Sequence, residues 1–165
     1  MKKISKTQAL LEYYHCYNAE NEMLELISNL ELKQIITEKE ADAINPYKIL
    51  EFTKSNIWEQ LKTAKKIYQE KPFYINVPAK QIYEQDIEED ILVQGIIDLY
   101  YIDKDDNLNL LDYKTDYVEN DKENELVQKY KKQLDLYKEA LEQALNKKVD
   151  KVYIYSVYLG KEIEM

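Results

Sequence analysis

Hydrophobic residues in the first part of the chain recur at steps of three and four, which is the spacing of a helix with one buried face. Residues that break helices are scarce there, so the pattern predicts helices up to about residue 66. The positions that follow this step are Leu10, Leu11 and Tyr14, and later Leu24, Ile27 and Leu30.

Two local signals mark where short helices begin. Thr37 is followed three residues later by Glu40, which is the form of a capping box. Asn45 precedes Pro46, so a good N-cap residue is followed by the residue best tolerated at the first helical position. We predict helices that start at these points and a third helix over residues 55–66. The inner side of the third would carry Ile57, Trp58, Leu61 and Ala64.

Strand signals replace the helical pattern after residue 66. Residues 67–77 are rich in aromatic and β-branched side chains, and Pro72 limits this segment to an edge strand or a bulge. Residues 91–102 and 108–113 form two further β-rich runs, separated by a polar turn at 103–107. These two runs therefore predict a hairpin.

The last third of the chain predicts a helix followed by a strand. Residues 121–146 contain no Gly or Pro and keep a helical step, which indicates one long helix. Residues 152–159 alternate again and end at Gly160, which indicates a last strand. The predicted order of elements is therefore helices, three strands, a helix and a strand. This order predicts an α/β or α+β fold.

Length and composition are those of one globular domain. The chain has 165 residues, of which 45% are hydrophobic and 33% charged, so we expect a single domain, with a helical region at 1–66 and a sheet core at 67–165. It contains neither an apolar run long enough for a bilayer nor an apolar signal segment behind Met1, and we expect a cytoplasmic protein without a membrane partner. The lone Cys16 cannot form an internal disulfide or supply a zinc site by itself.

The net charge argues against autonomous binding to a polyanion. It is -9, with an isoelectric point near 4.8, whereas proteins that bind nucleic acid by themselves usually display a basic surface. Two interpretations remain open. Either the chain has no role with nucleic acid, or bound cations or a larger assembly bring the phosphates to it.

Three residues of the hairpin could carry chemistry. Asp98 lies inside a strongly apolar strand, where an ionised carboxylate needs compensation. Asp112 and Lys114 are two residues apart, so a strand points both to one face, and the hairpin can bring Asp98 beside them. Two carboxylates and a lysine predict a Mg²⁺ or Mn²⁺ site whose lysine orients or deprotonates a water on the metal. Such a site suits phosphodiester hydrolysis.

Each of these signals also has a structural interpretation. Asp112 and Lys114 alone are typical of a surface ion pair, and Asp98 alone is as typical of a hydrogen-bond acceptor as of a metal ligand. The combination is more specific. It joins Gly-x-x-Asp in one hairpin strand, Asp-x-Lys at the exit of the next, and Gln133 and Tyr137 four apart on the following helix.

This combination resembles the PD-(D/E)XK nucleases of the RecB type, and more narrowly the nuclease domain that ends the AddA helicase–nucleases. The similarity is carried by residues 93–116 and 130–137 and extends to 68–73 and to nearly all of the chain. It implies a restriction-endonuclease-like core, in which a central mixed sheet of about four to five strands is flanked by helices. It also implies metal binding by Asp98, Asp112 and the backbone carbonyl of Tyr113. Lys114 would be the catalytic lysine, and the DNA side of the site would hold Thr115, Gln133 and Tyr137.

The chain departs from the family at one element. The family carries Gly-Thr-x-x-His on its first helix, with the histidine as a further metal ligand, and the nearest match here is Lys-Thr-Gln-Ala-Leu at residues 6–10. His15 is the single histidine and lies five residues beyond Leu10. Two explanations stay open: His15 replaces the missing ligand, or the true element lies upstream of this chain or is lost.

The resemblance implies partners that would bring DNA to this chain despite its net negative charge. In the similar enzymes the nuclease domain is fused to an ATP-driven helicase and paired with a second subunit, and together they deliver single-stranded DNA to it during the processing of double-strand ends for recombinational repair. ATP use would belong to that other part, since the two glycines here cannot build a phosphate-binding loop. An alternative is a catalytically weak module that binds DNA or a partner subunit through its long helix and sixteen tyrosines.

Overall fold

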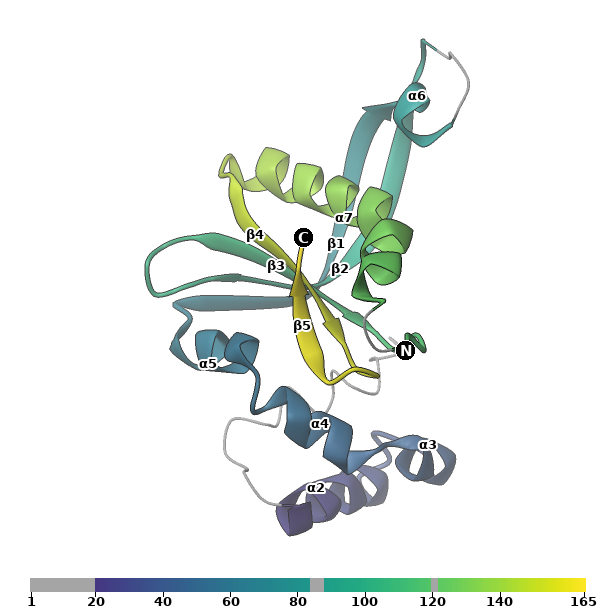
Figure 1. Ribbon diagram of the computed structural model, residues 1–165, viewed down its shortest axis with the longest axis vertical. Coiled ribbons are helices and arrows are strands. Elements are labelled where there is room, and N and C mark those ends of the chain that lie inside the picture. The colour runs from purple at the N-terminus through teal and green to yellow at the C-terminus, as the bar shows by residue number, and fades with distance from the viewer. Residues whose placement is uncertain (1–19, 84–87, 120–121) are drawn as a thin grey trace.

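The computed structural model describes residues 20–83, 88–119 and 122–165. His15, Cys16, the segment 6–10 and the hydrophobic positions before residue 20 lie outside this part of the chain. Four helices precede the sheet: α2 (Glu20–Leu32), α3 (Glu38–Ala43), α4 (Pro46–Phe52) and α5 (Asn56–Thr63). In Figure 1, α2, α3 and α4 gather at one end of the molecule.

The predicted helix starts are confirmed. Thr37 and Glu40 form both hydrogen bonds of the capping box at the start of α3, and the Asn45 side chain accepts from the Tyr47 backbone N–H at the start of α4. The third helix is shorter than predicted. It ends at Thr63, because Ala64 already adopts an extended backbone conformation.

The sheet has five strands in the order β1-β2-β3-β4-β5. Strands β3 and β4 pair in parallel and all other neighbours pair antiparallel, so the sheet is mixed, as predicted. The long helix α7 (Glu123–Leu145) is the crossover between the two parallel strands and lies across the sheet (Figure 1). The strands are β1 (Lys66–Pro78), β2 (Asp90–Ile102), β3 (Leu108–Lys114), β4 (Val149–Ser156) and β5 (Lys161–Glu164).

The hairpin of β2 and β3 is confirmed, and so is the edge position that Pro72 requires, since β1 is an outer strand of the sheet. The last predicted strand is wrong in its bounds. Strand β4 ends at Ser156, and Gly160, at a φ of 68°, belongs to a turn that leads into β5. Neither β5 nor the four-residue helix α6 (Ala79–Ile82) was predicted, because four residues are too few to show a period.

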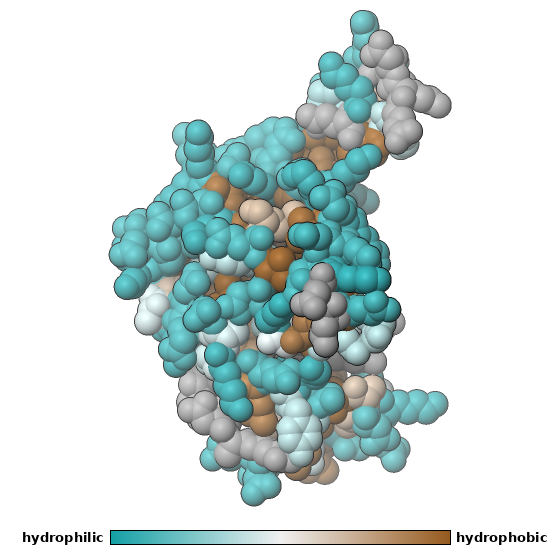
Figure 2. Space-filling model, in the orientation of Figure 1, coloured by the Kyte–Doolittle hydropathy of each residue, from teal (hydrophilic) through white to brown (hydrophobic). Residues whose placement is uncertain are grey.

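Two hydrophobic clusters lie on opposite faces of the sheet. One packs the sheet against α2, α4 and α5 through residues such as Met23, Trp58 and Leu99. The other packs it against α7 through residues such as Leu110 and Leu134. Hydrophilic side chains cover most of the face shown in Figure 2, and hydrophobic ones show between them only in patches. The described residues include no helix that is long and apolar enough to cross a membrane.

The regular alternation of side chains along β2 is broken at Asp98. Ile97 belongs to the cluster under α7, whereas Leu99, two residues later, belongs to the cluster on the other face. The partner strand is distorted at the same level, where Glu70 has a φ of 47° and the flanking pairs are Gln69 with Leu99 and Lys71 with Ile97. Beyond this level β1 and β2 project from the sheet as a two-stranded arm that carries α6 (Figure 1).

Candidate active site

The irregular point of β2 brings Asp98 against the neighbouring strand. The backbone N–H of Tyr113 donates a hydrogen bond of 3.1 Å to Asp98 Oδ2. Because side chains alternate along β3, Asp112 and Lys114 flank Tyr113 on the face that α7 covers. The hairpin therefore places Asp98 beside these two residues, as the sequence predicts.

Asp112 and Lys114 form a buried ion pair. Lys114 Nζ lies 2.6 Å from Asp112 Oδ2, and only 12% and 2% of the two side chains are exposed. Among the described residues, Asp112 Oδ2 has no hydrogen-bond partner. Its contact with Lys114 is therefore an attraction between opposite charges, and no N–H group of the described part is directed at this oxygen. The interpretation of this pair as a surface ion pair is wrong, because both groups are out of bulk solvent.

Helix α7 supplies the other side of the site. Gln133 Oε1 accepts a hydrogen bond of 3.3 Å from Lys114 Nζ, and Gln133 Nε2 donates to the Tyr137 hydroxyl at 2.6 Å. The spacing of four residues puts Gln133 and Tyr137 one helical turn apart, which permits this bond. Thr115, the residue after Lys114, is exposed.

Tyr130 also faces the lysine, and sequence reasoning missed it. The Lys114 ammonium lies 4.0 Å from the centre of the Tyr130 ring. The Tyr130 hydroxyl donates to Asp116 Oδ2 at 2.8 Å, and Asp116 also pairs with Lys129. The sequence does contain a signal for Tyr130. It lies three residues before Gln133, which places the two side chains on neighbouring turns of one helix face.

Gly95 controls the packing behind Tyr137. A Cβ atom at position 95 would lie 2.6 Å from Phe73 Cε1, so the missing side chain leaves room for the Phe73 ring. That ring packs edge to face against Tyr137, with centres 5.2 Å apart. The Gly-x-x-Asp pattern therefore has a physical basis: the glycine admits the ring that supports Tyr137, and Tyr137 holds Gln133 against Lys114.

Burial dominates the electrostatics of the two acids. It raises the pKa of Asp112 to about 6, although the neighbouring Lys114 offsets part of the effect and Asp98 adds to it. Burial also raises the pKa of Asp98, against the hydrogen bond from Tyr113 and the charge of Lys114, and Glu70 adds to the increase. Two carboxylates that are costly to ionise, beside a single lysine, leave negative charge that a cation would stabilise.

The donor set suits a hard divalent cation. Asp98 and Asp112 offer carboxylate oxygens, one of them without a hydrogen-bond donor, and oxygen ligands are those that Mg²⁺ and Mn²⁺ prefer. Within residues 20–83, 88–119 and 122–165, no three His, Cys, Asp or Glu side chains gather into a metal cluster. Further ligands would have to be a backbone carbonyl, water, substrate, or a residue outside the described part.

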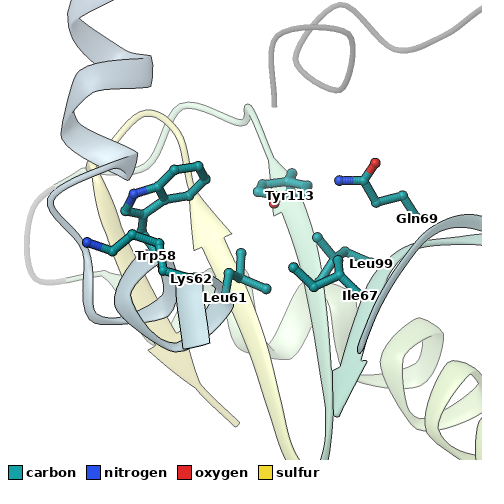
Figure 3. Close-up of a pocket in the computed structure, with 7 residues that line it drawn as sticks. All are labelled: Trp58, Leu61, Lys62, Ile67, Gln69, Leu99 and Tyr113. Atoms are coloured by element: carbon teal, nitrogen blue, oxygen red, sulfur yellow. The ribbon is translucent and has the colours of Figure 1, made fainter. Parts of the chain in front are cut away.

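A separate small pocket lies between α5 and strands β1 to β3 (Figure 3). Its walls include Trp58, Leu99 and the side chain of Tyr113, which points away from the face of Asp112 and Lys114. The cavity volume is about 30 Å³, enough for about one water molecule and too little for a nucleotide. The pocket therefore belongs to the packing behind the site.

A mixed sheet with Asp-x-Lys at the exit of a central strand and an acid on the preceding strand defines a class of protein. The model of the PD-(D/E)XK nuclease superfamily matches residues 8–163, and the chain belongs to this superfamily.

The similar proteins within this superfamily share one name. The chain is 37% identical to the A subunit of an ATP-dependent helicase/nuclease from Clostridium perfringens, over 88% of this chain and 12% of the relative. It is 43% identical to the protein of the same name from Clostridium botulinum, over 86% of this chain and 12% of the relative. The corresponding protein of Clostridium novyi is 40% identical over 81% of this chain. The chain thus spans 11% to 12% of the length of these relatives.

Proposed function

We propose that this chain is a metal-dependent deoxyribonuclease domain that hydrolyses phosphodiester bonds of single-stranded DNA. The observation that supports this most directly is the convergence of Asp98, Asp112 and Lys114 in one cluster under α7, in which Asp112 is buried and the other two are partly buried. A structural ion pair would not need a second, partly buried acid, whereas a cation site beside a lysine needs all three groups.

Asp98 and Asp112 would hold Mg²⁺ or Mn²⁺, together with the backbone carbonyl of Tyr113. When bound, the cation neutralises charge that builds on the phosphate during hydrolysis. His15 is a candidate for one more ligand, in place of the histidine that the family carries on its first helix. Because both acids are raised in pKa, a cation would also favour their ionised form.

Lys114 would orient the attacking water, and its positive charge would stabilise the hydroxide that forms as the water loses its proton to solvent. In hydrolysis the water oxygen bonds to phosphorus, the bond from phosphorus to the leaving oxygen breaks, and that oxygen takes up a proton. Lys114 is held for this role by Gln133 and by the ring of Tyr130. Thr115, Gln133 and Tyr137 would line the DNA side of the site.

We further propose that the domain acts inside a longer helicase–nuclease that processes DNA double-strand ends for recombinational repair. The names of the relatives and the small share of their length that this chain covers support a longer helicase–nuclease, and the repair role is what the family resemblance implies. A helicase and a second subunit would then deliver unwound strand, which explains how a domain with a net charge of -9 reaches a polyanion.

The test is cleavage of a labelled single-stranded oligonucleotide by the purified chain with Mg²⁺ or Mn²⁺. We expect cleavage by the parent, abolished by a chelator, and a loss of at least about a hundredfold in Asp98→Ala and in Lys114→Ala. Asp150→Ala and Lys151→Ala are matched controls, because both residues are exposed and lie at the start of β4, opposite the end that pairs with Lys114. Both controls should cleave like the parent.

Two results would contradict the proposal. Equal cleavage by the parent, Asp98→Ala and Lys114→Ala would mean that the activity comes from elsewhere. A folded parent that binds neither metal nor DNA and does not cleave would favour the alternative of a partner-binding module. Loss of metal affinity in His15→Ala would assign His15 as a ligand, and unchanged affinity would remove it.

A further inference from the structure

Two exposed tyrosines meet in the loops that follow the parallel strands β3 and β4. The rings of Tyr117 and Tyr158 pack edge to face, with centres 4.7 Å apart and planes at 62°. Their exposed fractions are 70% and 44%, so both rings face solvent although each is a large apolar group. The two residues are far apart in sequence and meet only because the strands are parallel neighbours.

The pair lies next to the candidate active site. Lys114 and Ser156, the last residues of β3 and β4, are partners in the sheet, and the Val157 N–H donates to the Lys114 carbonyl at 2.8 Å. Tyr117 is three residues beyond Lys114, and Tyr158 directly follows Val157. The tyrosine pair therefore lies at the same end of the sheet as Lys114.

The backbone on either side of Tyr117 is fixed. Asp116 is bonded to the Tyr130 hydroxyl and paired with Lys129, and Val118 is buried in the cluster under α7. Tyr117 is thus the exposed residue between two anchored neighbours.

The turn that carries Tyr158 is held equally firmly. The Ser156 hydroxyl accepts from the Leu159 N–H at 3.2 Å, and the Ser156 carbonyl accepts from the Gly160 N–H at 2.9 Å. Lys48 of α4 donates to the carbonyl of Tyr158 itself at 2.9 Å. The fold therefore holds both backbones in place while leaving both rings in solvent.

We propose that Tyr117 and Tyr158 form a stacking platform for a base of single-stranded DNA, a role that rests on the proposed nuclease function. Single-stranded DNA is the occupant because its bases have free faces, whereas those of a duplex are already stacked. An edge-to-face pair leaves ring faces uncovered, and a base stacks on an aromatic face whatever its sequence.

The charges around the pair suit stacking better than phosphate binding. Three acids near the two loops have lysine partners: Asp116 with Lys129, Glu119 with Lys122, and Glu51 with Lys48. These lysines offset part of the negative charge near the pair, although the whole chain is acidic. Stacking on bases is a contact that such a surface can make without a basic groove.

The test compares binding of two fluorescent oligonucleotides of equal length, one with normal bases and one in which the central nucleotides are abasic. Binding is measured by anisotropy with Mg²⁺ in the full chain carrying Lys114→Ala, which prevents cleavage but keeps both acids. We expect this protein to prefer the normal strand. The double change Tyr117→Ala with Tyr158→Ala should weaken binding of the normal strand about tenfold and leave the abasic strand unaffected.

Conservative variants separate stacking from general apolar contact. Changing both tyrosines to Phe or both to Trp should keep the preference, and changing both to Leu should remove it. The matched control is Tyr74→Ala with Tyr83→Ala, since these tyrosines are 68% and 54% exposed and lie in or beside the β1–β2 arm. All variants should keep the melting temperature, because the rings are in solvent.

Four outcomes would overturn the platform. They are equal binding of the normal and abasic strands, unchanged binding by the double Ala variant, full binding by the double Leu variant, and absence of any binding. Cleavage is measured separately: if the parent cleaves and loses activity in Asp98→Ala while the base preference is missing, the platform fails and the nuclease function stands. If base preference is found but no cleavage, the nuclease function fails.

Discussion

The Lys114 ammonium lies 4.0 Å from the centre of the Tyr130 ring, while Asp112 and Gln133 contact the same ammonium from other sides. A lysine has a long, flexible side chain, and ordering it costs conformational entropy. Here a carboxylate, an amide oxygen and a ring face hold it together. The proposed catalytic group is therefore positioned before substrate arrives.

Replacing Tyr130 tests this positioning. We expect Tyr130→Leu to lower kcat about tenfold with little change in KM, because a cation–π contact in a partly buried site contributes about 1–2 kcal/mol. Tyr130→Phe keeps the ring but loses the bond to Asp116, so it should retain most of the activity. Steady-state cleavage of single-stranded DNA by the two variants is the measurement. A larger loss in Tyr130→Phe than in Tyr130→Leu would show that the hydroxyl matters and the ring does not.

Gly95 offers a test of the support behind Tyr137. A methyl group at this position would press into Phe73, so we expect Gly95→Val to lower the free energy of unfolding by about 1–3 kcal/mol. Activity should fall as well, because Phe73 supports Tyr137 and, through it, Gln133. Urea unfolding and cleavage assays check the two parts. Gln94→Val is the control, since Gln94 is the exposed neighbour in the same strand and should cost little.

The buried Asp112 predicts how stability depends on pH without metal. Its pKa is about 6 in the fold against an ordinary 3.8, so the folded state binds the proton more tightly than the unfolded state. This contribution is complete below about pH 4 and is lost as the pH rises through about 6, which corresponds to at most about 3 kcal/mol. Urea unfolding at several pH values in a chelator should show the decrease. In Asp112→Asn the decrease should be clearly smaller, and an equal decrease would refute the assignment.

Metal should reverse that loss of stability. A cation that binds only the folded state at about one hundred times its dissociation constant adds about 2.7 kcal/mol to the free energy of unfolding. We expect Mg²⁺ or Mn²⁺ to raise the melting temperature of the parent and of Lys114→Ala at neutral pH. The increase should be absent in Asp98→Ala and in Asp112→Ala. The same increase in all four proteins would place the cation elsewhere.

Several features were predictable because their causes are local in sequence. Thr37 and Glu40 are three residues apart, and a capping box needs no partner from elsewhere in the fold. The period of two along β3 puts Asp112 and Lys114 on one face, and the short polar turn before it fixes the hairpin. Local spacing was sufficient for these elements and for the candidate acids and lysine.

Other features depend on contacts between distant segments. The side chains of β2 change faces of the sheet at Asp98, opposite the distortion of β1 at Glu70. The pattern of residues along β2 does not predict this change, because its cause involves a different strand. The strand β5 forms by pairing with β4, since its four residues carry no pattern of their own. The pairing of Tyr117 with Tyr158 likewise requires β3 and β4 to be parallel neighbours.

The sequence by itself determined the order of the main elements and which residues are candidates for the chemistry, because side-chain period and capping act over a few residues. Only the tertiary structure decided that the two acids and the lysine meet in a site with little exposure to solvent, that Tyr130 covers the lysine, and that two exposed tyrosines pack together at the same end of the sheet. Burial and pairing across a sheet depend on which strands become neighbours. That choice is made by packing over the whole domain.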